Sequence, residues 1–149
     1  MASPVILFFN EQSSYIIKRK TVIRSILSSV CVDENKPLKG LNIVFCDDNY
    51  LFKLNKTYLN HHTFTDVITF SYSDNIDEVM GDIFISVERA QENSRLLKVG
   101  LASEVNRLMI HGLLHLCGHN DKTELQKLNM RKIEDKYLSL LADSGTKNR

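Results

Sequence analysis

The chain has 149 residues, of which 43% are hydrophobic and 25% are charged. This length and balance predict one globular domain with a single core and leave no room for two. The formal net charge of +1 excludes a protein that coats nucleic acid through bulk positive charge. It does not exclude a local basic patch, because the field depends on where the charges lie.

Cysteine usage and the start of the chain predict the compartment. Cys31, Cys46 and Cys117 are odd in number and show no CxxC spacing, so they do not indicate a disulfide framework. The start lacks a basic region, and its apolar run, residues 5–9, is too short for a signal peptide or a membrane span. We therefore expect a cytoplasmic protein with no membrane association.

The first elements of the chain are two strands with a helix between them. Residues 5–9 are a β-rich apolar run, which predicts a strand. Apolar residues recur at helical spacing over residues 14–30, with basic residues between them, which predicts an amphipathic helix. Pro37 and Gly40 mark a connection, and residues 41–46 then alternate as a second strand does.

The middle of the chain predicts a short helix followed by a pair of strands. Asp47 and Asp48 can cap the helix, and residues 60–64 after it are polar and irregular. Residues 66–70 and 81–85 are β-rich runs separated by a polar loop.

The last part of the chain predicts three helices. Ser86 starts one that Gly100 can end, and a second runs over residues 103–117 with Gly118 as its stop. Thr123 and the glutamine three residues later form a capping-box pattern ahead of the last helix.

This order of elements predicts the α+β class. We expect a single domain over residues 1–142, with a mixed sheet of about four strands covered by about five helices. Residues 143–149 are expected to form a disordered tail.

One short segment carries the residues with metal-binding chemistry. His111 and His115 are four apart on a predicted helix, so both rings leave the same face and can reach one zinc ion. Gly118 ends the helix and permits a left-handed turn, after which the Asp121 carboxylate can close the site. Three protein ligands leave a fourth position for water, which is the arrangement of a catalytic zinc site.

His119 competes with Asp121 as the third ligand, since it lies four residues past His115. It could bind only if the helix continued through Gly118, and three stacked helical histidines would span two turns, about 12 Å. Asp121 is therefore favoured. The other interpretation of the pair is that His111 and His115 are ordinary helix histidines; they interrupt a very apolar run, where unpartnered imidazoles would be costly to bury.

The segment resembles the signature of the YbeY family of bacterial rRNA-processing metallo-endoribonucleases, which reads H-G-x-L-H-L-x-G-Y-D-H. The matching residues are His111, Gly112, Leu114, His115, Leu116 and Gly118. Two further blocks are similar to the family's N-x-x-Y-R…T-[DN]-V-L-S-F and G-D-I-x-I-S patterns. They are Asn55 with Tyr58 and residues 65–70, and residues 81–86. The resemblance covers roughly residues 41–141.

The resemblance implies a zincin-like motif helix on one sheet and one Zn²⁺ per chain. It implies zinc-dependent, single-strand-specific endoribonuclease activity, with maturation of the 3′ end of small-subunit (16S) rRNA and ribosome quality control as the task. Single-stranded RNA and the ribosome are the implied partners, and DNA is not expected. No general base is assigned, because Asp66 and Asp82, the acidic residues of the matched blocks, also fit structural roles.

Two departures from the family pattern concern the site. Asp121 replaces the third histidine, so the ion and its ligands carry +1 in place of +2, and we expect an activity optimum at higher pH. Leu59 replaces the arginine that follows the tyrosine, which puts phosphate binding in question; His61 and His62 are possible substitutes.

Two other functions compete with a nuclease. A metalloprotease shares the HxxxHxxGxx spacing, but its catalytic glutamate would stand at Gly112, which has no side chain to act as a base. The alternative of a different class is a ribosome-associated RNA-binding or assembly factor with weak or no nuclease activity. Basic residues between 18 and 24, with Lys53 and Lys56, could meet rRNA phosphates or could simply be solvated.

Overall fold

The computed structural model describes residues 5–60 and 65–147, and only the backbone of residues 143–147. Within them, four strands and five helices form one α+β domain, which confirms the predicted class. In chain order they are β1 (Val5–Glu11), α1 (Lys20–Asp33), β2 (Leu38–Cys46), α2 (Asp48–Leu59), β3 (Val67–Ser71), β4 (Val79–Ser86), α3 (Val87–Leu97), α4 (Leu101–Leu116) and α5 (Glu124–Lys147).

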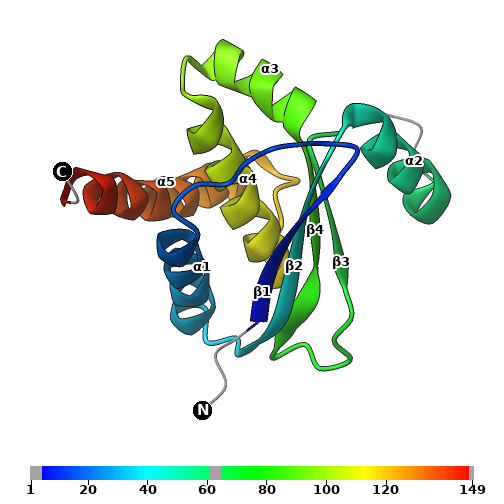
Figure 1. Cartoon of the computed structure of the whole chain (residues 1–149). Helices are drawn as coiled ribbons and strands as arrows, with labels where there is room; N and C mark the ends of the chain where they lie inside the picture. The colour runs from blue at the N-terminus through cyan, green and yellow to red at the C-terminus, as the bar shows by residue number, and fades with distance from the viewer. Residues whose placement is uncertain (1–4, 61–64, 148–149) are drawn as a thin grey trace.

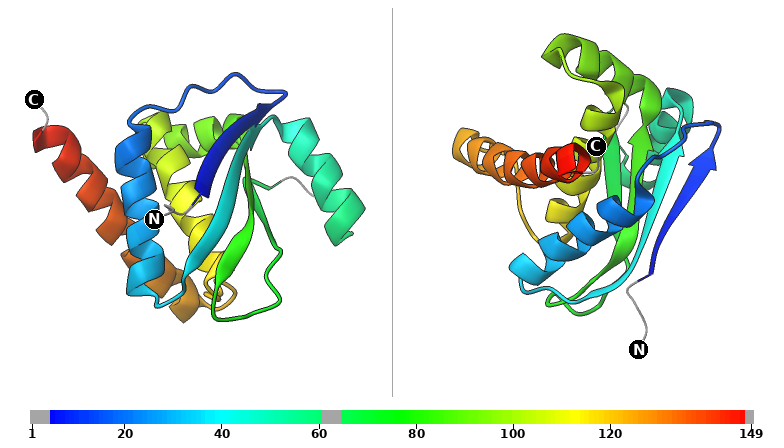
Figure 2. Two further views of the ribbon diagram at one scale, coloured as in Figure 1. Left: turned by 60° about the horizontal axis from the view of Figure 1, so that its bottom comes forward. Right: turned by 60° about the vertical axis from the view of Figure 1, so that its left-hand side comes forward.

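The sheet is mixed and has the strand order β1-β2-β4-β3 (Figure 1). β2 pairs in parallel with β1 and β4, whereas β3 runs antiparallel to β4 and forms one edge of the sheet. Helices α1, α4 and α5 lie on one side of the sheet and α2 lies on the other (Figure 2). The edge strand β3 therefore lies beside the helix that carries the two motif histidines.

The main core lies between the sheet and helices α1, α4 and α5. Alternate residues of the central strands, such as Ile43 and Ile83, point into it and are fully buried. Leu108 and Leu113 of α4 meet them from the helix side. A smaller cluster on the other face packs α2 against the sheet through Leu51. Both faces of the central strands are thus covered toward their C-terminal ends, where burial becomes nearly continuous.

The helix predicted over residues 14–30 begins later than expected, at Lys20. Residues 14–19 are not helical, because burial alternates there: Tyr15 and Ile17 pack against the core while Ile16 is 79% exposed. The side chain of Asn10 exchanges two hydrogen bonds with the backbone of Tyr15 and holds this segment. An extended alternation was therefore misread as a helical period.

Two glycines do not have the roles predicted for them. Gly40 lies inside β2, which begins at Leu38, and does not belong to a connection. Gly100 does not end α3; that helix stops at Leu97, with Lys98 in the left-handed conformation. Gly100 is the residue before α4, where an extended backbone starts the next helix.

The longest helix, α5, is assigned as far as Lys147, and the disordered tail expected at residues 143–149 stays a prediction. Once a helix is formed, each further residue adds a backbone hydrogen bond at little extra entropic cost. Residues 148 and 149 lie outside the described residues, and the domain boundary at residue 142 stays a prediction. No described helix combines the length and the apolar character needed to cross a bilayer.

Candidate metal centre

Helix α4 brings His111 and His115 together. The two residues are one helical turn apart, and their Nε2 atoms lie 3.0 Å from each other. The neighbouring positions of α4, among them Leu113 and Leu114, are fully buried against the sheet and fix the rotation of the helix. The ring face is therefore set by the packing of the opposite, apolar face.

The chain reverses direction directly after α4. Gly118 has a φ of +104°, and its N–H donates to the carbonyl of His115 at 3.0 Å. The next N–H, that of His119, donates to Leu114 at 3.0 Å. These two bonds around a left-handed glycine form a Schellman motif, which satisfies the last carbonyls of the helix. The predicted stop at Gly118 is thus correct, and the chain turns back toward the histidine pair.

The start of α5 closes the other end of this loop. The Thr123 hydroxyl accepts from the backbone of Gln126, and the Gln126 side chain accepts from the backbone of Thr123, both at 3.1 Å. This reciprocal pair is the predicted capping box. Between the two fixed ends lies Asp121, whose Oδ2 is 3.2 Å from Nε2 of His111 and 3.4 Å from Nε2 of His115.

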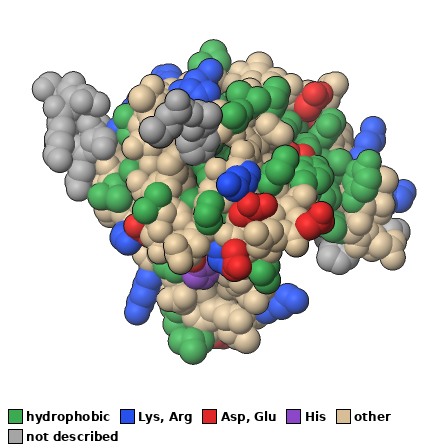
Figure 3. Space-filling view, turned by 90° about the horizontal axis from the view of Figure 1, so that it is seen from below, with side chains coloured by type: hydrophobic (Ala, Val, Ile, Leu, Met, Phe, Trp, Pro, Cys, Tyr) green, Lys and Arg blue, Asp and Glu red, His purple; other side chains and the backbone are tan. Residues whose placement is uncertain are grey.

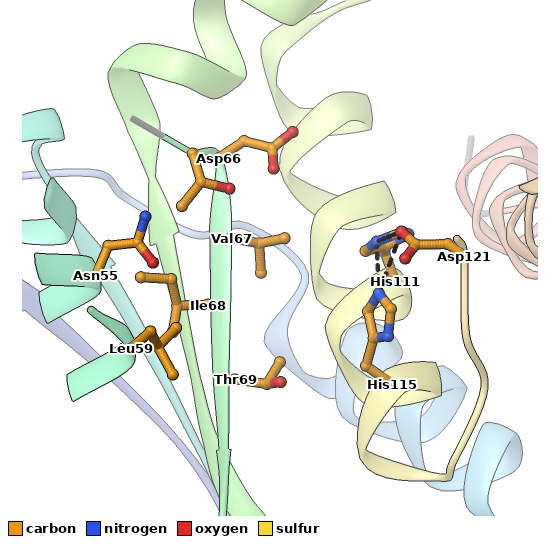
Figure 4. A pocket seen from close by; sticks show the side chains of 10 residues that line it. Asn55, Leu59, Asp66, Val67, Ile68, Thr69, His111, His115 and Asp121 are labelled. Carbon is orange, nitrogen blue, oxygen red and sulfur yellow. Dashed lines mark hydrogen bonds and ion pairs between the residues drawn. The ribbon is translucent and has the colours of Figure 1, made fainter. Parts of the chain in front are cut away.

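The three facing atoms have the spacing of zinc ligands. They are separated by 3.0, 3.2 and 3.4 Å. A tetrahedral zinc with ligands at 2.0–2.1 Å requires a ligand-to-ligand separation of about 3.3–3.4 Å. Figure 4 shows the three side chains pointing toward one another. The donor set of two imidazoles and one carboxylate, close to this spacing, could hold one metal ion.

The far side of each ring is held by an acceptor. Nδ1 of His111 lies 2.5 Å from the Glu134 carboxylate, and Nδ1 of His115 lies 3.0 Å from the carbonyl of His119. Since an ionised carboxylate and a carbonyl can only accept, Nδ1 is the protonated nitrogen in the neutral form of each ring, and Nε2 then presents a lone pair. Two lone pairs and a carboxylate that face one another repel, and a cation between them would stabilise the arrangement.

Glu134 belongs to a buried network of charges. Arg107 donates to Glu134 at 3.1 Å and to Glu104 at 2.6 and 2.8 Å, and both carboxylates are 1% exposed. Asn93 then bridges Glu104 to Asp66 through bonds of 3.1 and 3.0 Å. The network connects a candidate metal ligand to the beginning of β3.

The ion pairs of this network set the ionisation of its members. Burial alone would raise the pKa of Glu134, but the hydrogen bonds from His111 and Arg107 and the charge of Arg107 hold that pKa below its usual range. Burial alone would lower the pKa of Arg107, and the two glutamates outweigh it and raise that pKa. Glu134 is therefore an anion that supports the His111 ring.

His119, the competing third ligand, is directed elsewhere. Its Nε2 lies 2.6 Å from a carboxylate oxygen of Glu34, at the end of α1. The Schellman turn ends the helix before His119, so its ring does not continue the row of His111 and His115. Asp121 is the residue that the structure brings to the histidine pair.

Gly112 has no side chain that could act as a base, and its small size is also required for packing. A Cβ at this position would lie 2.8 Å from the side chain of Ile83 on β4. α4 therefore packs against the sheet at Gly112, and a glutamate there would clash with the core and point away from the histidine pair. The catalytic base of a metalloprotease does not fit at this position.

A cleft of about 410 Å³ lies beside the three candidate ligands. Residues 65–69 at the edge strand β3 form the wall opposite α4, and Asn55 and Leu59 of α2 close the far end (Figure 4). Leu59 occupies the position at which the family pattern has an arginine. Its apolar side chain is 40% exposed. The substitutes suggested for it, His61 and His62, lie outside the described residues.

The two aspartates of the matched blocks have different surroundings. Asp66 lines the cleft, and one of its oxygens accepts the Asn93 amide at 3.0 Å. Asp82 does not line it; its two oxygens accept from Asn42 at 3.0 Å and from Tyr72 at 2.6 Å. Asp82 therefore has a structural role between strands.

The basic residues singled out in the sequence do not line the cleft. Arg19 donates to the carbonyl of Leu141 and Arg24 to that of Ile6, each at 3.0 Å, so both tie elements of the fold together. Lys53 and Lys56 are exposed on α2. On the face shown in Figure 3, Lys and Arg side chains are dispersed among acidic and apolar ones and do not form one continuous basic surface.

Sequence reasoning missed Glu134, Arg107 and Glu104. Glu134 had a detectable signal, since it interrupts the buried face of α5 formed by Met130, Tyr137 and Leu141. A glutamate within an apolar helical stripe requires a partner, and that partner comes from α4. Nothing in the sequence indicates which residue it is.

The chain is similar to known proteins over most of its length. The sequence model of the family described as Endoribonuclease YbeY matches residues 8–142. The Endoribonuclease YbeY of Flavobacterium psychrophilum is 48% identical over 132 residues, which are 89% of this chain and 94% of that protein. The Endoribonuclease YbeY of Cytophaga hutchinsonii is 39% identical over 140 residues, which are 94% of this chain and 98% of that protein.

A solved structure shares the fold. The solution structure of a Thermotoga maritima protein superposes with a TM-score of 0.65 and covers 97% of this chain and 93% of its own. The sequence identity of this pair is 21%, so the likeness concerns the fold alone.

Proposed function

This chain belongs to the YbeY family of endoribonucleases, and we propose that it cleaves single-stranded RNA with one zinc ion held by His111, His115 and Asp121. The family makes it a hydrolase of phosphodiester bonds. The observation that supports the metal is the triangle of two Nε2 atoms and one carboxylate oxygen, 3.0–3.4 Å on each side. That spacing suits a tetrahedral ion with one ligand position left open.

A zinc ion bound there would supply a Lewis acid for the phosphoryl group and would lower the pKa of a water molecule. The residues of the chain position this chemistry. Glu134 and the carbonyl of His119 hold the two Nδ1 protons, so both Nε2 lone pairs are directed to the same point. The β3 wall of the cleft and Leu59 then limit where an RNA strand can lie beside the ligands.

We further propose that the RNA is the 3′ end of small-subunit (16S) rRNA and that the protein acts on the ribosome in the cytoplasm. The family relationship supports an RNA substrate. The free, buried thiols of Cys31, Cys46 and Cys117 are compatible with a reducing compartment. DNA is not expected as a substrate.

The test is RNA cleavage by the metal-loaded protein, with and without a chelator, next to the His115→Ala variant. We expect cleavage of a single-stranded RNA that both the chelator and the substitution abolish. Cleavage that survives both treatments would come from a different site or from a contaminant, and would overturn the metal assignment.

A ribosome-associated binding factor with weak or no nuclease activity is the second candidate. The observation in its favour is Leu59, an apolar residue in the cleft where a cation would hold phosphate. If the metal-loaded protein binds RNA but does not cleave it, this second function is correct. Substitution of Leu59 by arginine would then be expected to strengthen RNA binding.

A further inference from the structure

A second hollow adjoins the candidate metal centre on the side away from β3. It is a groove of about 340 Å³ between α4 and the first turns of α5. His111 and Asp121 line both the cleft and this groove, so they form the ridge between the two hollows. An extended RNA strand that reaches the metal centre through the cleft would therefore continue into the groove.

The two hollows differ in charge. Among the described residues that line the cleft there are two carboxylates, Asp66 and Asp121, and no lysine or arginine. The groove is lined by three cationic side chains, those of Arg107, Lys127 and Arg131, together with three carboxylates, those of Asp121, Glu124 and Glu134. A single-stranded RNA that crosses the ridge would therefore find lysine and arginine side chains in the groove beside α5 and none in the described lining of the cleft.

Arg107 is buried in ion pairs within the protein, whereas the side chains of Lys127 and Arg131 on α5 are exposed to solvent. Arg107 donates to two buried glutamates, and its side chain is 13% exposed. The side chains of Lys127 and Arg131 are 57% and 47% exposed. Each forms an i,i+3 ion pair with a glutamate of α5, at 3.7 Å for Lys127 with Glu124 and 3.8 Å for Arg131 with Glu134, both longer than a hydrogen bond.

Helix geometry places these cations along the groove. Lys127 and Arg131 are four residues apart and so lie one above the other on the same face of α5. Leu128 lies between them, lines the groove and is 63% exposed. A leucine exposed between two cations can contact a ribose or a base while the cations hold the phosphates.

We propose that Lys127 and Arg131 bind backbone phosphates of the RNA strand on one side of the scissile bond, with Leu128 against the intervening nucleotide. This inference rests on the proposed function, since it takes RNA as the substrate. The groove fixes the path of the strand, and the cleft receives the nucleotide on the other side of the ridge.

The test compares Lys127→Gln/Arg131→Gln with Lys132→Gln/Lys136→Gln. The control pair has the same helix, spacing and charge change, but its residues do not line the groove. Binding of a fluorescent single-stranded phosphorothioate RNA is measured by anisotropy over a salt series, with the integrity of the RNA checked on a gel. Removing one cation from a phosphate should lower the slope of log K against log salt by about 0.7, so the groove pair should lower it by about 1.4.

Steady-state cleavage gives the second readout. The groove pair should raise KM several-fold and leave kcat within about twofold, because it removes interactions made equally in the ground and transition states. Lys127→Arg/Arg131→Lys keeps both charges and should behave as wild type, and melting curves show that all variants fold. A groove pair that matches the control pair in slope and KM overturns the proposal. If wild type cleaves no RNA, the proposed function fails, and the salt slopes still decide whether α5 binds phosphates.

Discussion

The two parts of the candidate metal centre are held in different ways. His111 and His115 lie on α4, whose opposite face is buried in the main core, and each ring has its Nδ1 bonded to a fixed acceptor. Asp121 lies on a loop of a few residues, and its side chain is 38% exposed. The histidine pair is therefore positioned by folding itself, whereas the carboxylate is positioned by the two ends of its loop.

This difference predicts how the site responds to substitution. Substitutions of residues that contact the Nδ1 side of the histidine rings, such as Glu134, should lower both the stability of the fold and the affinity for metal, because Glu134 is part of a buried network. Changes in the loop should affect the metal much more than the fold, since the Schellman turn and the capping box are local structures. A variant that reverses this order would contradict the distinction between the two parts.

Arg107→Ala should have the largest effect on stability. It leaves Glu104 and Glu134 buried without their common cation, which costs about 3–5 kcal/mol of unfolding free energy. Urea denaturation of the metal-free protein measures it. The control is Arg89→Ala, which removes a partly exposed pair with Asp48 at 3.0 Å and should cost about 1 kcal/mol or less. Equal destabilisation of the two variants would contradict the account.

The same variant should shift acid unfolding to higher pH. The pKa of Glu134 is held low, so its contribution to stability is present above the ordinary glutamate range and is lost as pH falls through the lowered value. Arg107 is one of the causes of that low value, so removing it raises the pKa and the contribution is lost at a higher pH. Circular dichroism along an acid titration measures the midpoint.

Glu134→Gln should weaken metal binding by about 10–100-fold, the range seen when a carboxylate behind a ligand histidine is lost. The amide keeps the size of the side chain but removes the charge that supports the His111 ring. Competition with a chromophoric zinc chelator measures the affinity. Glu124→Gln, on the same helix but with a side chain that is 92% exposed, is the control and should bind as wild type. An unchanged affinity for Glu134→Gln would show that the hydrogen bond does not support the site.

The sequence predicted the part of the site that is local in the chain. His111, His115, Gly118 and Asp121 lie within eleven residues, so helical spacing and one turn residue are enough to suggest that they meet. The sheet and its five helices were also predictable, because apolar periodicity and turn residues mark most elements.

The rest could not be predicted, because it depends on how elements pack. The network from His111 through Glu134 and Arg107 joins α4 to α5, and no spacing rule selects these partners. The groove beside α5 depends on the angle between two helices. The late start of α1 has a similar cause: Tyr15 lies against the ring of Phe45, a tertiary contact that favours an extended segment over a helix.

Thr123→Ala should have a smaller effect, about 1 kcal/mol of stability, because it removes one N-cap hydrogen bond. It also frees the end of the loop that carries Asp121, so metal affinity should fall as well. The control is Asp47→Ala, which removes the N-cap of α2 and should cost similar stability without weakening the metal. Denaturation and chelator competition on both variants measure this. If the two caps affect metal affinity equally, the loop is not what positions the carboxylate.

The weakest effect that we expect concerns the charge of the loop ligand. Asp121→His would keep three ligands and raise the charge of the ion with its ligands from +1 to +2. A higher positive charge favours ionisation of nearby water, so the pH–rate profile of the variant should lie at lower pH than that of wild type. Cleavage of one RNA over a pH series, with zinc content measured at each point, gives the comparison, and Asp121→Asn shows how far loss of the charge alone moves the profile. If the histidine variant binds zinc fully and its profile coincides with that of wild type, then the carboxylate does not tune the reaction, and Asp121 serves only to complete the ligand set.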